Sequence, residues 1–92
     1  TVLECKPVEG AKKLLVSQIK IGSETKQIVS GIADSYTPDE MAGKKVVVVT
    51  NLKPCKLRGV LSEGMILAAS DGKSLSLVAP EKADIADGSE VR

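Results

Sequence analysis

The chain has almost no aromatic residues and no histidine. Phe, Trp and His are absent, and Tyr36 is the only aromatic side chain among the 92 residues. The hydrophobic share of 42% therefore consists almost wholly of Val, Leu, Ile and Ala, and we expect an aliphatic core. Without imidazole, the chain lacks the side chain used most often for general acid–base catalysis and metal binding near neutral pH.

Cysteine is also scarce. Cys5 and Cys55 are far apart in the sequence, and neither belongs to a Cys-x-x-Cys motif. This spacing, without histidine, excludes the usual zinc and redox motifs. We therefore expect two reduced thiols in a cytoplasmic protein, with no metal and no cofactor.

Long apolar runs are missing as well. Apolar runs such as Val46 to Val49 are far short of the roughly 20 residues that span a bilayer, so we expect no membrane segment. From Thr1 onward there is no secretory signal pattern, and the chain starts inside a strand-like stretch, which predicts a trimmed N-terminus. A chain this short cannot bury two separate cores, so residues 1–92 are expected to form one domain.

The net charge is only +1, but the charges are segregated. Between Met41 and Ser62 there is no acid, whereas the segment from Glu81 to Glu90 holds four acids and one lysine. The cations of the first segment are Lys44, Lys45, Lys53, Lys56 and Arg58. Because local potential steers a ligand more than total charge does, this segment is either a basic face for phosphate or an ordinary solvated surface.

Short β-branched runs separated by turn-forming residues predict a small all-β domain. The first three strands are expected at residues 2–8, 14–21 and 26–32, with turns at Glu9-Gly10 and Gly22-Ser23. Residues 37–43 then predict one short helix. Its signals are Thr37 as N-cap, Pro38 at the first helical position, Glu40 completing a capping box and Gly43 as the stop.

After the helix, residues 44–51 predict a strand buried on both faces, because four consecutive valines do not alternate with polar residues. Residues 52–59 predict a loop, and residues 60–69 and 74–79 predict two further strands joined by the Asp71-Gly72 turn. Three strands, a short helix and then more strands is the order of an OB-fold, a five-stranded barrel with a helix between strands three and four.

The predicted loop has the composition of a binding loop. Lys53, Lys56 and Arg58 lie on a segment restricted by Pro54 and Gly59. The amide of Asn51 and the hydroxyl of Ser62 flank it, so it offers charge to phosphates and hydrogen bonds to ribose or base edges. A solvated connection between two strands has the same composition, and physics alone does not separate the two interpretations.

The run from Asn51 to Ser70, NLKPCKLRGVLSEGMILAAS, is similar to the signature of the EMAP-like tRNA-binding domain. Two earlier pieces agree in order, namely EGAKKL from Glu9 and IVSGI from Ile28. The resemblance covers nearly the whole chain. It implies an OB-fold that binds tRNA by shape and backbone with little sequence preference.

The same resemblance implies a biological setting. In this family the domain is appended to the C-terminus of bacterial methionyl-tRNA synthetases, where it increases affinity for tRNA, or it acts as a free-standing tRNA-binding protein. The implied partners are therefore tRNA and a methionyl-tRNA synthetase in cis or in trans, and bacterial members are typically homodimers. The implied RNA-binding residues are Lys13, Asn51, Lys53, Lys56, Arg58, Ser62 and Met65.

Two other function classes have less support in the sequence. Catalysis by this chain lacks support, because no serine or cysteine has a histidine to activate it and no glycine-rich loop precedes a helix. A peptide-binding export chaperone on the same barrel would require an exposed apolar groove in place of a basic face. Glu63 and Gly64 favour the synthetase-type branch of the family. The absence of aromatic stacking platforms favours a structured RNA over an unpaired strand.

Overall fold

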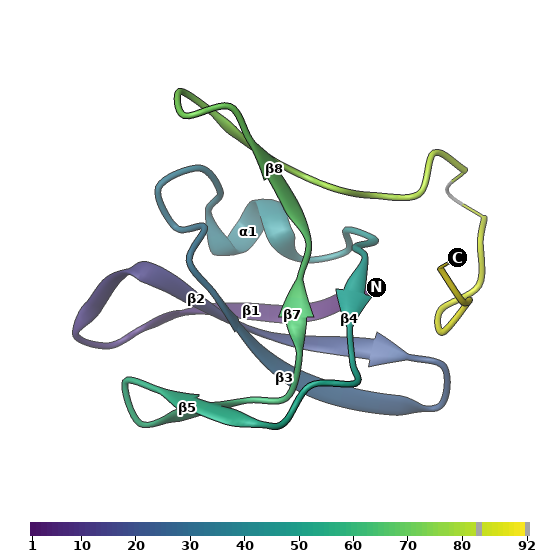
Figure 1. Cartoon of the computed structure of the whole chain (residues 1–92), viewed down its shortest axis with the longest axis horizontal. Coiled ribbons are helices and arrows are strands. Elements are labelled where there is room, and N and C mark those ends of the chain that lie inside the picture. The colour runs from purple at the N-terminus through teal and green to yellow at the C-terminus, as the bar shows by residue number, and fades with distance from the viewer. Residues whose placement is uncertain (83, 92) are drawn as a thin grey trace.

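The computed structural model describes residues 1–82 and 84–91, and these form an all-β domain with one short helix (Figure 1). The elements follow in the order β1 (Val2–Val8), β2 (Ala11–Ile21), β3 (Glu24–Ser30), α1 (Pro38–Met41), β4 (Val48–Val49), β5 (Cys55–Leu57), β6 (Val60–Ser62), β7 (Met65–Ile66), β8 (Ala68–Ser70) and β9 (Leu75–Leu77).

The three long strands form one antiparallel sheet in the order β1-β2-β3. Tight turns at Gly10 and Gly22 connect them, and both glycines have positive φ (77° and 62°). Along β2, Leu15 and Ile19 point into the core and alternate with more exposed residues, as a half-buried strand requires. The three predicted strands and their two turns are therefore confirmed.

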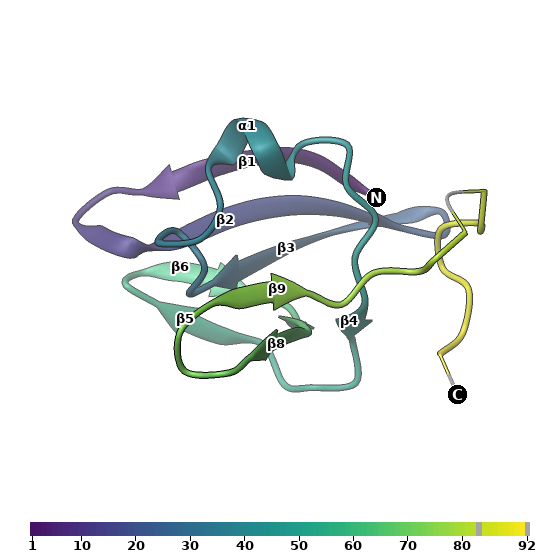
Figure 2. The ribbon, with the colours of Figure 1, turned by 90° about the horizontal axis from the view of Figure 1, so that it is seen from above.

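Helix α1 begins as the sequence indicates. The Thr37 hydroxyl accepts a hydrogen bond from the Glu40 backbone N–H, and the Glu40 carboxylate accepts one from the Thr37 N–H, which completes the capping box. Met41 at the end of the helix is fully buried and packs in the main core with Val2, Leu15 and Ile28. The helix thus covers one side of the sheet (Figure 2).

The second half of the chain forms three pairs of short strands. Strand β4 pairs with β7, β5 with β6, and β8 with β9, each as a separate two-stranded antiparallel unit. Figure 2 shows these pairs beyond the β3 edge of the long sheet, whereas α1 lies beside β1. The sheets of the described residues are open and do not form a continuous closed barrel.

Three expectations for this half need correction. The strand predicted at residues 44–51 is limited to Val48–Val49, and Val46 to Val49 are only half-buried because they also line a groove. The loop predicted at residues 52–59 contains β5, because Cys55–Leu57 pairs with Val60–Ser62. The single strand predicted at residues 60–69 is divided into three short strands, with Gly64 between the first two.

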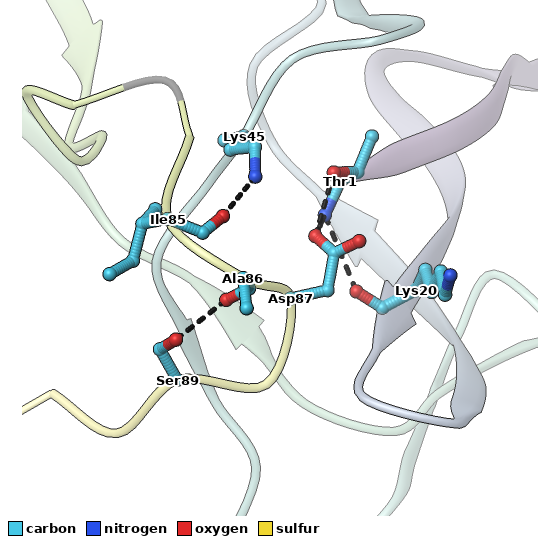
Figure 3. Close-up of polar contacts among 7 residues, drawn as sticks. All are labelled: Thr1, Lys20, Lys45, Ile85, Ala86, Asp87 and Ser89. Atoms are coloured by element: carbon cyan, nitrogen blue, oxygen red, sulfur yellow. Dashed lines mark hydrogen bonds and ion pairs between the residues drawn. The ribbon is translucent and has the colours of Figure 1, made fainter.

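The segment after β9 returns to the sheet and is held at its end (Figure 3). The Asp87 carboxylate accepts hydrogen bonds from the Thr1 amino group and the Thr1 hydroxyl, both at 2.7 Å. The Lys45 ammonium donates to the Ile85 carbonyl. Gly88 lies against Gly22, where an added Cβ would come within 2.7 Å of the Gly22 nitrogen.

Candidate nucleic-acid interface

The cations of the predicted binding loop lie on a β-hairpin, made of β5, β6 and the two residues between them. Leu57 pairs with Val60, so Arg58 and Gly59 form the turn. Their φ angles are 53° and 80°, as in a type I′ turn, which suits the twist of paired strands. The hairpin therefore presents Lys56 on a strand and Arg58 at its free end.

Arg58 is the one residue other than glycine with positive φ among the described residues. Asn, Asp or Gly usually occupies this turn position, because other side chains crowd the backbone there. An arginine at such a position lowers the stability of the turn, and backbone strain of this kind is characteristic of functional sites. The side chain of Arg58 is thus a good candidate for ligand contact.

The hairpin and the segment before it are open to solvent. Every residue from Asn51 to Gly59 is exposed, including Lys53, Lys56 and Arg58. In the part of the chain that the structure describes, the two ion pairs are Lys6 with Glu4 and the Thr1 amino group with Asp87, so neither uses a cation of this segment. These positive charges are therefore free to neutralise phosphates.

Side-chain hydrogen bonds anchor this hairpin to strand β3. The Ser62 hydroxyl accepts the Val29 N–H at 3.0 Å, and the Glu63 carboxylate accepts the Gln27 N–H at 3.0 Å. The Gln27 side-chain amide donates to the Leu61 carbonyl at 2.7 Å, and the Glu63 N–H donates to the Gln27 carbonyl at 2.7 Å. The position of the hairpin relative to the sheet is set by these bonds.

Two of the residues in this arrangement were not identified from the sequence. Gln27 bonds the hairpin directly, and the Gln18 amide donates to the Gln27 side-chain oxygen at 2.9 Å. A signal for them exists in the sequence, because the Gly22-Ser23 turn fixes a register in which Gln18 and Gln27 are cross-strand partners.

The predicted site residues do not form one compact cluster. Lys56 and Arg58 share the hairpin, and Val60 packs against the satellite cluster of Val8, Ala11 and Val29 beside the β1–β2 turn. This packing brings the free end of the hairpin to the end of the sheet that carries the β1–β2 turn (Figure 1). Exposed Lys13 follows that turn near the start of β2.

The other predicted residues lie before, within and after the hairpin in the chain. Asn51 and Lys53 precede the hairpin, and Met65 lies on β7 with 52% of its surface exposed. Ser62 is only 6% exposed, and its hydroxyl also donates to the Gly64 carbonyl at 3.1 Å. The geometry of Ser62 therefore suits a structural role better than direct contact with RNA.

A groove with a cavity volume of about 840 Å³ lies on another side of the domain. The valines around β4 form one wall, and the C-terminal segment around Asp87 forms another. The hydrogen bonds from the Thr1 amino group and then from the Thr1 hydroxyl lower the pKa of Asp87 to about 2. Lys20, Lys45 and the predicted site residue Asn51 are also among the residues that line the groove.

The described residues offer neither a metal site nor a membrane-spanning helix. Among residues 1–82 and 84–91, no group of three or more His, Cys, Asp or Glu side chains is arranged to hold a metal ion. In the same residues, α1 is too short to cross a membrane and no other helix could do so.

Comparison with known sequences gives a consistent family. A family model described as "Putative tRNA binding domain" matches residues 1–90. A methionine–tRNA ligase of Clostridium perfringens is 56% identical over 93 residues, and one of Methanocaldococcus jannaschii is 52% identical over 92 residues. Each alignment covers 99% of this chain but 14% of the relative, so the chain spans about a seventh of these curated proteins.

Solved structures match over the whole domain. A MetRS-related protein from Pyrococcus horikoshii has a TM-score of 0.91 and 35% identity, covering 99% of this chain and 84% of that one. The chaperone CsaA from Bacillus anthracis has a TM-score of 0.90 at 22% identity, covering 100% of this chain and 85% of that one. At this lower identity the likeness to CsaA concerns the fold alone.

Proposed function

The chain belongs to the tRNA-binding domain family, and from this premise we propose that it is a non-catalytic tRNA-binding module of a cytoplasmic methionyl-tRNA synthetase. In this role it increases the affinity of the synthetase, in cis or in trans, for the tRNA backbone. The alignments with two methionine–tRNA ligases over 99% of the chain support this setting.

The observation that carries the proposal is the exposed basic hairpin. Its cations Lys56 and Arg58, with Lys53 before it and Lys13 beside its free end, are all solvent-exposed. Arginine and lysine bind phosphate oxygens through charge-assisted hydrogen bonds, which suits recognition of a folded RNA by its backbone. Asn51 and Met65 are assigned to the periphery of this surface, where an amide and a thioether can contact ribose or a base.

We further propose that the domain closes as an OB-fold barrel. Backbone hydrogen bonds between the short sheets support this closure. The Val2 N–H donates to the Lys44 carbonyl at 2.8 Å, the Leu67 N–H to the Val47 carbonyl at 2.9 Å, and the Glu63 N–H to the Gln27 carbonyl. Slow amide exchange at Val2, Leu67 and Glu63 is the expected result; rapid exchange at all three would mean that the barrel is open.

Binding of tRNA by paired variants tests the main proposal. Replacing Lys56 by Ala together with Arg58 by Asn is expected to weaken tRNA binding by about 1–3 kcal/mol, the scale of lost charge-assisted bonds. Lys82→Ala, which removes a charge from an exposed site among C-terminal acids, is the matched control and is expected to change binding little. Equal losses in the two proteins, measured by fluorescence anisotropy, would place the binding face elsewhere.

We also propose that the domain forms homodimers through the groove between β4 and the C-terminal segment. Aliphatic side chains line it, and Val91 at its border is 71% exposed, so a second copy would cover apolar surface. Val47→Glu is expected to shift sedimentation toward the monomer while leaving the hairpin unchanged. A monomeric parent domain would contradict this part of the proposal.

The same groove is the observation that favours a second candidate, binding of an extended apolar peptide. Groove binding depends little on salt, whereas phosphate binding weakens steeply as salt rises. A peptide whose affinity for the domain changed little with salt and fell in Val47→Glu would favour this second function.

A further inference from the structure

We infer that Gln27, Ser62 and Glu63, supported by Gln18, form a clasp that positions the basic hairpin for tRNA. In this inference Ser62 contributes to binding through the hairpin and does not itself touch RNA. The inference rests on the proposed function, because it concerns how the same basic surface is held.

The hairpin needs an external support. Its two strands contain three residues each, and an isolated two-stranded hairpin is marginally stable in water. Every residue of β5 and of the turn is exposed, and Val60 is the hairpin residue that packs against a described hydrophobic cluster. Apolar packing therefore holds the turn end of the hairpin only weakly. Hydrogen bonds to β3 are needed to hold the other end in place.

The clasp provides these bonds along the free edge of β3. Strand β2 pairs with one edge of β3, and the other edge carries the N–H groups of Gln27 and Val29. Side-chain oxygens of Glu63 and Ser62 accept these N–H groups, where a regular fourth strand would offer backbone carbonyls. The hairpin is thus joined to the sheet without a continuous strand ladder.

Gln27 has the central position in the clasp. Its side-chain oxygen accepts the Gln18 amide at 2.9 Å, so its nitrogen is the atom directed at the Leu61 carbonyl. Leu61 is the cross-strand partner of Lys56. Gln18 on the central strand β2 is therefore connected through Gln27 to the hairpin, which carries the proposed phosphate-binding residue Lys56.

A hairpin that is already ordered in the free domain binds RNA more tightly, because binding does not have to order it. If the hairpin were free to move, binding would have to order it, and this cost would lower the affinity. The cations themselves would remain, so the number of phosphates contacted would stay the same. Loss of the clasp should therefore lower affinity without changing the salt dependence of binding.

A double-mutant cycle tests this inference with the whole 92-residue domain and folded tRNA. Gln27→Ala and Ser62→Ala are each expected to weaken binding about three- to tenfold, the scale of one lost hydrogen bond. Both should leave the slope of log affinity against log salt unchanged. In the background of Lys56→Ala with Arg58→Asn, the same two substitutions should have little further effect, because the hairpin no longer carries its charges.

Two further variants control for general damage to the fold. Gln18→Ala touches no hairpin residue and should give a smaller loss in the same direction. Thr25→Ala replaces an exposed β3 residue outside the clasp and should bind as the parent does. In free Gln27→Ala, amide exchange at residues 55–62 should speed up while exchange at buried Leu15 and Ile19 stays slow.

Several results would overturn the inference. A Ser62→Ala loss that adds fully to the hairpin variant, or that reduces the salt slope, would mean that Ser62 contacts RNA directly. Unchanged affinity and unchanged exchange in Gln27→Ala would mean that the clasp positions nothing. If the parent domain failed to bind tRNA at all, the proposed function would fail with it, and exchange at residues 55–62 would then report the clasp as a purely structural device.

Discussion

At the scale of single residues, backbone conformation and side-chain chemistry make separate contributions at the hairpin turn. Arg58 has a φ of 53° in a turn that Asn would adopt at lower cost. The sequence identified Arg58 by its charge, but the positive φ became visible only in the fold. The two contributions can be separated by one substitution.

Arg58→Asn is expected to stabilise the domain slightly, by roughly 0.5 kcal/mol, because Asn tolerates the left-handed conformation. The same change should weaken tRNA binding several-fold, because the guanidinium is lost. Urea denaturation and fluorescence anisotropy measure the two effects. A variant that binds as tightly as the parent would show that the arginine side chain is not part of the interface.

Cys55 lies between cations on β5, yet its thiol offers neither charge nor a strong donor. It is exposed, and its thiol has a long 3.8 Å contact to the Lys56 carbonyl. Cys55→Ala is therefore expected to leave tRNA affinity within about twofold of the parent. A large loss with an unchanged unfolding transition would reveal a role for the thiol.

Ser62 and Gln27 illustrate what a sequence pattern conveys about a site. The hydroxyl of Ser62 was predicted to bind RNA because it follows the cations, but burial of the side chain is decided by how β6 sits on β3. The Gly22-Ser23 turn predicts that Gln27 pairs with Gln18, but the bond from Gln27 to the Leu61 carbonyl depends on the tertiary fold. Both roles depend on contacts more than thirty positions apart in the chain.

At the scale of elements, local signals predicted the first half of the fold well. The capping box at Thr37 and Glu40 and the turns at Gly10 and Gly22 depend on neighbouring residues, so they are visible in the sequence. The prediction that the valines at residues 46–49 belong to a long strand buried on both faces was wrong. The burial of these valines depends on the distant segment around Asp87, with which they form the groove.

The docked C-terminal segment should loosen in acid. In a chain that begins at Thr1, the Thr1 amino group and hydroxyl lower the pKa of Asp87 from 3.8 to about 2, so the charged form is favoured when the segment is docked. The stabilisation is therefore fully present above pH about 4 and is lost as the pH falls through about 2. Amide exchange at Gly88 and Ser89 should speed up across this window.

Asp87→Asn is the matched variant for this pH dependence. It should loosen the segment already at neutral pH and remove the acid-dependent change at Gly88, while amides in β2 serve as the internal reference. Identical profiles for the parent and Asp87→Asn would show that another group holds the segment.

At the scale of the whole molecule, charge is divided between two regions of an almost neutral domain. The cations from Met41 to Ser62 include those of the hairpin, and the acids from Glu81 to Glu90 include Asp87 in the docked C-terminal segment. The sequence was sufficient to predict this division and the all-β class. The path of the hairpin could not be predicted, because it depends on tertiary contacts with β3.

The salt dependence of tRNA binding tests the central claim most directly. If the exposed hairpin neutralises phosphates, log affinity should fall linearly with log salt, and Lys56→Ala with Arg58→Asn should flatten this slope by about 1 for each lost phosphate contact. Lys82→Ala should keep the parent slope. A parent domain whose affinity for tRNA stays constant from low to high salt would contradict the account.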